Sequence, residues 1–135
     1  MKNTNPIGFL DADHKRNFIA ALEETCSVDG DGYVSAYFGA SLYLLTGLRY
    51  IWPRLKKHIG RSYIDAGSML ESLDLSTGEE MIVKLAGNLY NGGFWYGSPW
   101  DLIAALDNET FSLVLEALRL RKDKMFLLDG EVTVQ

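Results

Sequence analysis

The sequence predicts a mainly α-helical fold, a compact bundle of about five to seven short helices in a single domain over residues 1–135. Apolar residues recur at spacings of three and four more often than two, which is the periodicity of helices. Serine, aspartate and proline stand where these helices would begin, and glycine or asparagine where they would end. The apolar fraction of 47% and the charged fraction of 23% are those of an ordinary globular domain of this length.

Two helices are expected after an N-terminal arm of about ten residues. The first runs from an N-cap at Asp11 or Asp13 to about Thr25. The second runs from about Tyr33 to Thr46 and is apolar almost all round, which is typical of a helix at the centre of a bundle. The residues of the first helix that we expect to be buried are Phe18, Ile19 and Leu22.

The middle of the chain is expected to form short helices joined by turns. Pro53 lacks the amide N–H that a helix interior needs, and Gly60 interrupts the pattern again. A further short helix is predicted from Ala66 to Leu73.

The strongest start signal lies at Ser76. Ser76 and Glu79 have the spacing of a capping box, in which each side chain accepts a hydrogen bond from the backbone N–H of the other residue. The helix that follows is expected to end at residues 91–93, where asparagine is followed by two glycines. Its apolar face is formed by Met81, Ile82, Leu85 and Leu89.

Two more helices and a hairpin complete the predicted fold. Ser98 and the proline after it begin a short helix to about Leu106, and Asp107 or Asn108 caps the last long helix. The tail, residues 125–135, has two β-prone runs around Asp-Gly and can form a β-hairpin. A lone hairpin is marginal, so this one would need something to pack on.

Charge and composition limit where the protein acts and what it binds. A net charge of -5 gives no general attraction for nucleic acid or for an anionic membrane, so we expect neither as a partner. The N-terminus has no signal-peptide pattern, and no apolar run is long enough to span a bilayer. A single cysteine, Cys26, fits a reducing compartment, so we expect a cytoplasmic protein.

No pattern for catalysis, for a metal or for a cofactor is recognised, so we predict no catalytic residue, no metal and no cofactor. Asp29-Gly-Asp31-Gly begins like a calcium loop, but Tyr33 and Ala40 stand where oxygen ligands are needed. The two histidines, His14 and His58, fall on different predicted elements. A hydrolase centred on His14 is kept as an alternative, and the simpler interpretation is that its ring is hydrogen-bonded locally.

A basic segment interleaved with aromatic residues offers a second alternative. Arg54, Lys57 and Arg61, with Trp52 or Tyr63, can hold a small anionic ligand such as a nucleotide, because cations bind phosphate and aromatic rings stack on bases. The same residues also fit a solvated face with packed aromatics, a nucleic-acid contact, or a patch for an acidic protein partner.

An aromatic segment separates two predicted helices. Phe94, Trp95, Tyr96 and Trp100 stand among glycines between the two helix ends. They can cap the bundle, or they can contact a partner or an identical subunit, because tryptophan and tyrosine dominate the energetics of interfaces. We predict these four residues as the partner-binding site.

Nearly the whole chain up to about Arg121 resembles a family of small, uncharacterised bacterial and prophage proteins, a domain of unknown function. The resemblance rests on FLDADHKRNF, DGYVSAYFGASLYLLTG, LSTGEEMIVKLAGNLYNGG and LIAALDNETFSLVLEALRLR. It implies an accessory protein of phage or mobile-element origin and carries no chemistry. Our main functional prediction is therefore a non-enzymatic protein-interaction module of that origin. Its partner would be a host or phage protein, with inhibition of a host system as one role, or a second copy in a homodimer.

Overall fold

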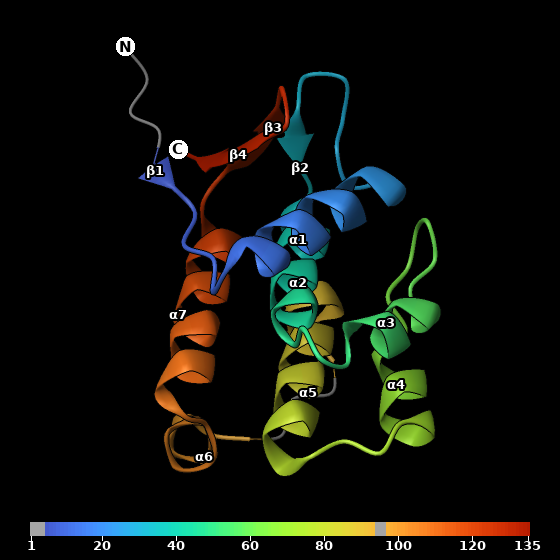
Figure 1. The fold of residues 1–135 in the computed structure, drawn as a ribbon, viewed down its shortest axis with the longest axis vertical. Coiled ribbons are helices and arrows are strands. Elements are labelled where there is room, and N and C mark those ends of the chain that lie inside the picture. The colour runs from blue at the N-terminus through green and yellow to red at the C-terminus, as the bar shows by residue number, and fades with distance from the viewer. Residues whose placement is uncertain (1–4, 94–96) are drawn as a thin grey trace.

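The computed structural model describes residues 5–93 and 97–135 (Figure 1). The described residues form a mainly helical fold with a C-terminal β-hairpin, which confirms the predicted fold class. The helices are α1 (Ala12–Glu24), α2 (Ala36–Gly47), α3 (Trp52–Leu55), the 3-10 helix η1 (Lys56–His58), α4 (Ala66–Ser72), α5 (Thr77–Asn91), α6 (Pro99–Ala105) and α7 (Asn108–Lys122). The strands are β1 (Asn5–Pro6), β2 (Tyr33–Val34), β3 (Met125–Leu128) and β4 (Glu131–Val134).

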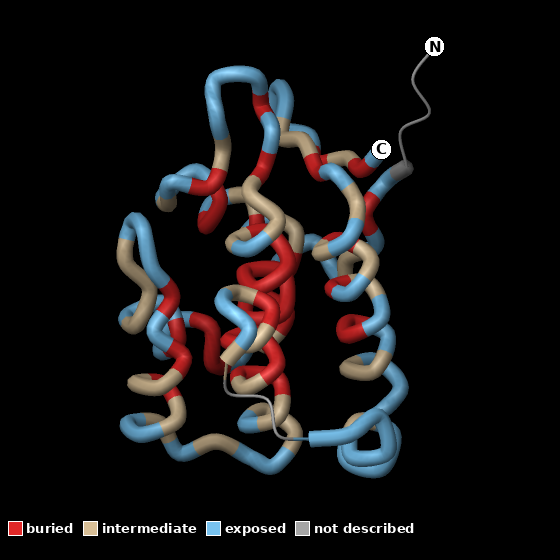
Figure 2. The backbone as a smooth tube through the Cα atoms, turned by 180° about the vertical axis from the view of Figure 1, so that it is seen from behind, coloured by how far each residue is buried: buried red, intermediate tan, exposed pale blue. Residues whose placement is uncertain are grey.

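Helix α2 lies at the centre of the bundle, as its apolar sequence predicts. Every residue from Gly39 to Gly47 is buried, and the helix packs against α1, α5 and α7. In Figure 2 this buried stretch runs through the middle of the molecule. The polar side chains within it are hydrogen-bonded: Ser41 Oγ donates to the Ala86 carbonyl at 2.9 Å, and Thr46 Oγ1 donates to the Leu42 carbonyl at 2.6 Å.

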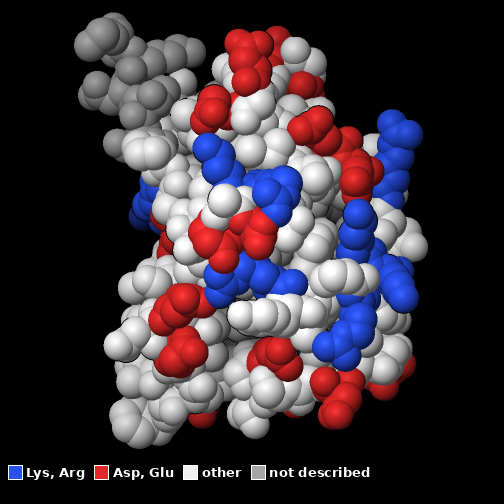
Figure 3. All heavy atoms as spheres, viewed as in Figure 1, with Lys and Arg blue, Asp and Glu red and all other residues white. Residues whose placement is uncertain are grey.

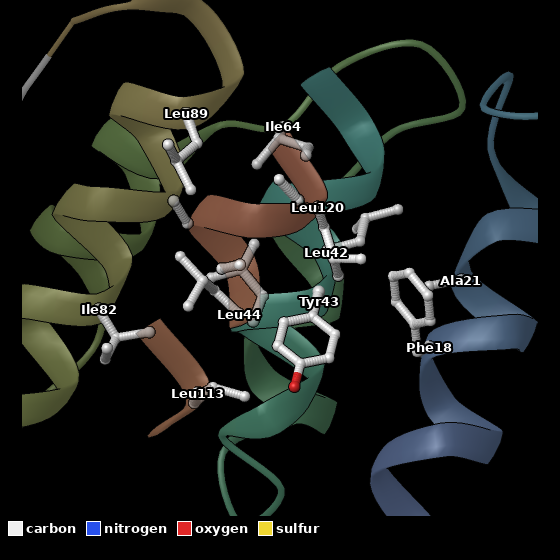
Figure 4. Packing of buried hydrophobic residues seen from close by; sticks show 14 of the residues in the cluster. Phe18, Ala21, Leu42, Tyr43, Leu44, Ile64, Ile82, Leu89, Leu113 and Leu120 are labelled. Atoms are coloured by element: carbon white, nitrogen blue, oxygen red, sulfur yellow. The ribbon is translucent and has the colours of Figure 1, made fainter. Parts of the chain in front are cut away.

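The core is formed by side chains that converge on α2 from three helices (Figure 4). Phe18 of α1 meets Tyr43 of α2 edge to face, with 5.8 Å between ring centroids. The Tyr43 hydroxyl donates to the Gly8 carbonyl and so ties the N-terminal arm to the core. The outer helices contribute Ile82 and Leu89 from α5, and Leu113 and Leu120 from α7.

The predicted hairpin packs within a four-stranded sheet. Strands β3 and β4 are joined at Asp129 and Gly130, which both have positive φ, as a type I′ turn requires. The strand order is β1-β4-β3-β2, and all pairs are antiparallel. The two short outer strands therefore supply the support that a lone hairpin lacks, and the pairing of β1 with β4 brings the N-terminal and C-terminal strands together.

The predicted start of the second helix at Tyr33 is wrong. Tyr33 and Val34 form β2, and α2 begins at Ala36. The partners of β2 are Phe126 and Met125, far away in the sequence, so no local pattern could reveal this pairing.

The predicted helix starts are otherwise confirmed by their caps. Asp11, Ser76, Ser98 and Asp107 each accept a hydrogen bond from the backbone N–H three residues further on. At Ser76 and Ser98 the reciprocal bond is also present, so both capping boxes are complete. Sequence signals for helix starts are reliable here because each bond joins residues only three apart.

The contact between α2 and α7 yields a test of the packing. A Cβ added at Gly47 would lie 2.6 Å from Leu113 Cδ1 and 3.2 Å from its Cγ, and Leu113 is itself 1% exposed. We expect Gly47→Ala to lower the free energy of unfolding by about 1–3 kcal/mol because the core has no room for the methyl group. Urea unfolding followed by circular dichroism measures this change.

The matched control is Gly78→Ala in α5, where the nearest atom to the new Cβ would be Leu106 Cδ2 at 3.7 Å. Alanine favours helix over glycine by about 1 kcal/mol, so this variant is expected to be as stable as the wild type or more stable. A Gly47→Ala variant at least as stable as the wild type would contradict the packing described.

Candidate functional site

His14, the candidate for hydrolytic chemistry, is fully buried in the first turn of α1. Its Nδ1 accepts a hydrogen bond from the Leu10 backbone N–H at 3.1 Å, which places the ring proton on Nε2. Nε2 then donates to the Tyr43 carbonyl at 2.9 Å. The ring also packs against Phe9, with 5.1 Å between centroids, and against Tyr43, with 4.7 Å. His14 therefore joins the N-terminal arm, α1 and α2.

The environment of His14 keeps the ring neutral. Burial lowers its pKa to about 4, against the opposing effect of the hydrogen bond to the Tyr43 carbonyl. A general base needs a free lone pair within reach of its substrate, and the lone pair of Nδ1 is already bonded to Leu10 in the interior. This arrangement gives His14 a structural role, as the simpler interpretation of the sequence expects.

The other reactive side chains do not converge with His14. His58 Nδ1 is 2.7 Å from Ser68 Oγ, which joins η1 to α4, and Cys26 is exposed after α1. Within residues 5–93 and 97–135, no three or more His, Cys, Asp or Glu side chains are grouped so that they could hold a metal ion.

A cavity of about 390 Å³ lies where α2 ends and where α5 and α7 begin. The charged side chains that line it already serve the fold. Asp107 caps α7, and Glu79 completes the capping box of α5. Arg49 pairs with Glu109, at 2.5 Å between Nη2 and Oε1, and with Asp11. The cavity thus lies at a junction of helix ends, and each charged side chain among the described residues that line it already has a partner.

The predicted anion-binding residues divide into a surface group and a core residue. Arg54, Lys57 and Arg61, which we call the basic strip, are exposed, and Tyr63 beside them is 55% exposed. Figure 3 shows Lys and Arg side chains gathered in a column over the side of the molecule that α3 forms in Figure 1. Trp52 is only 6% exposed and belongs to the core, so its ring is not available to stack on a ligand.

The hollow beside the basic strip is small. A cavity of about 120 Å³ is lined by Trp52, Lys56 and Arg61 together with the C-terminal part of α1. Pockets for drug-sized ligands are typically about 300–1,000 Å³. This cavity is too small to enclose a nucleotide, so the strip presents a surface and not a pocket.

The predicted partner-binding segment is described in part. Phe94, Trp95 and Tyr96 lie outside the described residues, and Trp100 is in the first turn of α6. Trp100 is 70% exposed, and Ile103, three residues later on the same helix, is 57% exposed. No residue of α6 is buried.

Ile103 was not among the predicted partner-binding residues. The signal was present, because positions three apart lie side by side on a helix, and Trp100 was already singled out. Arg49 was not among the predicted site residues, because its bridge between Asp11 and Glu109 joins segments far apart in the sequence, which no spacing predicts.

Comparisons with protein-family models, with curated proteins and with solved structures find no significant match. The resemblance to small bacterial and prophage proteins therefore stays a prediction, and the site has to be argued from this chain's own residues. Among the described helices, none has the length and apolar character needed to cross a membrane.

Burial of His14 predicts a pH dependence of stability. Above pH 6.5 the ring is neutral in both states, and between pH 6.5 and about 4 the unfolded chain takes up a proton that the folded protein does not. Stability is expected to fall as the pH falls through this window, by about 3 kcal/mol in total. Chemical unfolding at a series of pH values measures the slope.

The comparison variant is His14→Gln, which removes the titrating ring and keeps an amide donor for the Tyr43 carbonyl. It is expected to be less stable than the wild type at pH 7.5 and to lose most of the slope between pH 6.5 and 5. His58→Gln retains His14 and is expected to retain the slope. If the stability of the wild type and of His14→Gln depended equally on pH, buried His14 would not be the cause of the pH dependence.

Proposed function

We propose that the protein is a non-enzymatic protein-interaction module whose contact surface is centred on α6. The observation that carries this proposal is the exposure of Trp100 and Ile103 on a helix that buries none of its residues. Within α6 only Leu102 packs, partly buried, against the core, so the exposed apolar side chains of Trp100 and Ile103 are weakly explained by folding alone. Exposed tryptophan beside a branched aliphatic side chain is the kind of anchor on which interfaces depend.

The N-terminus of α6 is preorganised by its capping interactions. Ser98 accepts from the Asp101 N–H while the Asp101 carboxylate accepts from the Ser98 N–H at 2.7 Å, and Pro99 fixes the first helical position. A partner would therefore meet a preformed helix end, so that little conformational entropy is lost on binding.

The partner in this proposal is a host or phage protein, or a second copy of the chain in a homodimer. The resemblance noted in the sequence supports an accessory role in a phage or mobile element, with inhibition of a host system as one such role and the cytoplasm as its place of action. A hydrolase has less support, because the His14 ring is buried and both of its nitrogens are already hydrogen-bonded. The small cavity beside the basic strip gives a nucleotide-binding pocket less support.

Replacement of Trp100 tests the proposal. We expect Trp100→Ala to weaken the association, whether with a second copy or with a captured host protein, by about tenfold or more, because truncation of an anchoring tryptophan commonly costs about 2 kcal/mol. Light scattering coupled to size exclusion measures self-association, and affinity capture from cell extract followed by a direct binding measurement covers a host partner. Stability should be almost unchanged because the side chain is 70% exposed.

The matched control is Leu128→Ala, which truncates a 54% exposed apolar side chain on β3, at the other end of the molecule (Figure 1). It is expected to associate as the wild type does. Equal association by the wild type and both variants would refute a role for α6, and so would a wild-type protein that is monomeric and captures nothing.

A further inference from the structure

We infer that the basic strip, Arg54, Lys57 and Arg61, is a second docking surface and that it takes an acidic segment of a protein. It lies on the α3 side of the bundle, whereas α6 lies beneath α7 (Figures 1 and 3). This inference uses none of the residues of the proposal for α6, so each of the two can be tested independently of the other.

The three cations of the strip are not used by the fold. Within the described chain, none of their side chains makes a hydrogen bond or an ion pair, whereas Lys56 between them pairs with Glu24 at 3.5 Å. Arg54 and Lys57 are three residues apart in consecutive helical turns, so they lie side by side. Neighbouring like charges repel, and a protein with a net charge of -5 has acids that could have neutralised them. An external anionic group would relieve this repulsion.

The backbone beneath the strip is held firmly. The Arg61 carbonyl accepts from the Cys26 N–H at 2.6 Å, which fixes it to the end of α1. The Gly60 N–H donates to the Tyr63 carbonyl at 2.9 Å and closes a tight turn, flanked by a bridge between Ile59 and Ile64. These backbone bonds hold the turn that carries Arg61 and Tyr63 against the end of α1, while the charged side chains remain free to adjust to a partner.

The Tyr63 ring completes the surface. It lies directly over Gly60, where a Cβ would meet the ring, and it remains 55% exposed beside the cations. A tyrosine in this position offers both an apolar face and a hydroxyl, which suits a polypeptide better than a bare phosphate.

The surroundings of the strip favour an acidic protein segment over a nucleic acid. The hollow of about 120 Å³ beside it is too small for a nucleotide. Glu24 lies at the edge, and the whole molecule is acidic, so a long polyanion would be repelled beyond the strip itself. A short run of Asp or Glu can contact the three cations without extending over the acidic remainder.

The experiment uses the full chain and, as probe, a fluorescein-labelled peptide of about ten glutamates, with binding followed by anisotropy at about 20 mM and about 300 mM salt. We expect saturable binding at low salt that weakens at high salt. The triple variant Arg54→Ala, Lys57→Ala, Arg61→Ala is expected to bind about tenfold more weakly, which corresponds to about 1.4 kcal/mol shared among three exposed charge contacts.

A second triple variant serves as the matched control: Lys84→Ala, Lys122→Ala, Lys124→Ala. It has the same net charge of -8 as the strip variant, because each loses three cations from a protein of net charge -5. It is expected to bind the peptide as the wild type does. Trp100→Ala is also expected to bind the peptide normally, which separates failure of this inference from failure of the proposal for α6.

A measurement on the wild type does not depend on how the variants fold. In an amide correlation spectrum, titration with the peptide should shift the signals of residues 54–63 and leave those of α6 in place. The inference is overturned by absence of peptide binding, by equal losses in the two triple variants, or by shifts elsewhere. Tighter binding of a thymidine oligonucleotide of equal length would overturn the choice of an acidic protein segment as the occupant.

Discussion

The burial of α2 on all sides is the constraint that organises the molecule. A helix without a polar face has to be covered all round, and α1, α5 and α7 do so. Two glycines let the neighbouring elements come close: Leu113 of α7 packs over Gly47, and Met125 of β3 packs over Gly39. The strands join the two ends of the chain above the helices, so even the C-terminal hairpin depends on this arrangement (Figure 1).

Most polar side chains that this packing buries have hydrogen-bond partners in the interior. His14, Ser41 and Thr46 are bonded to backbone carbonyls or amides, and Arg49 bridges two carboxylates, although its Nε is buried without a partner among the described residues. Groups that are bonded in this way stabilise the fold and are not free to react. Both proposed contact surfaces lie on the outside, where α6 presents apolar side chains and the basic strip presents charge. The first kind of surface supplies affinity, and the second supplies association rate and choice of partner.

The sequence by itself determined the features that depend on neighbouring residues. The capping boxes at Ser76 and Ser98 and the N-cap at Asp107 mark their helices because each involves groups only three residues apart. The apolar composition of the helix predicted from about Tyr33 to Thr46 was enough to place it at the centre, where α2 lies. The hairpin was visible because Asp129 and Gly130 suit a turn in which both residues have positive φ.

Only the tertiary structure decided the features that join distant segments. Strand β2 exists because β3 lies beside it, and residues around Tyr33 read locally as the start of a helix. Trp52 and Trp100 are the same residue type near helix starts, yet one is buried in the core and the other is exposed. The difference arises because burial depends on which surface the folded chain brings to a side chain. The spacing of residues in the sequence predicts only contacts between residues within a few turns of the same helix or strand.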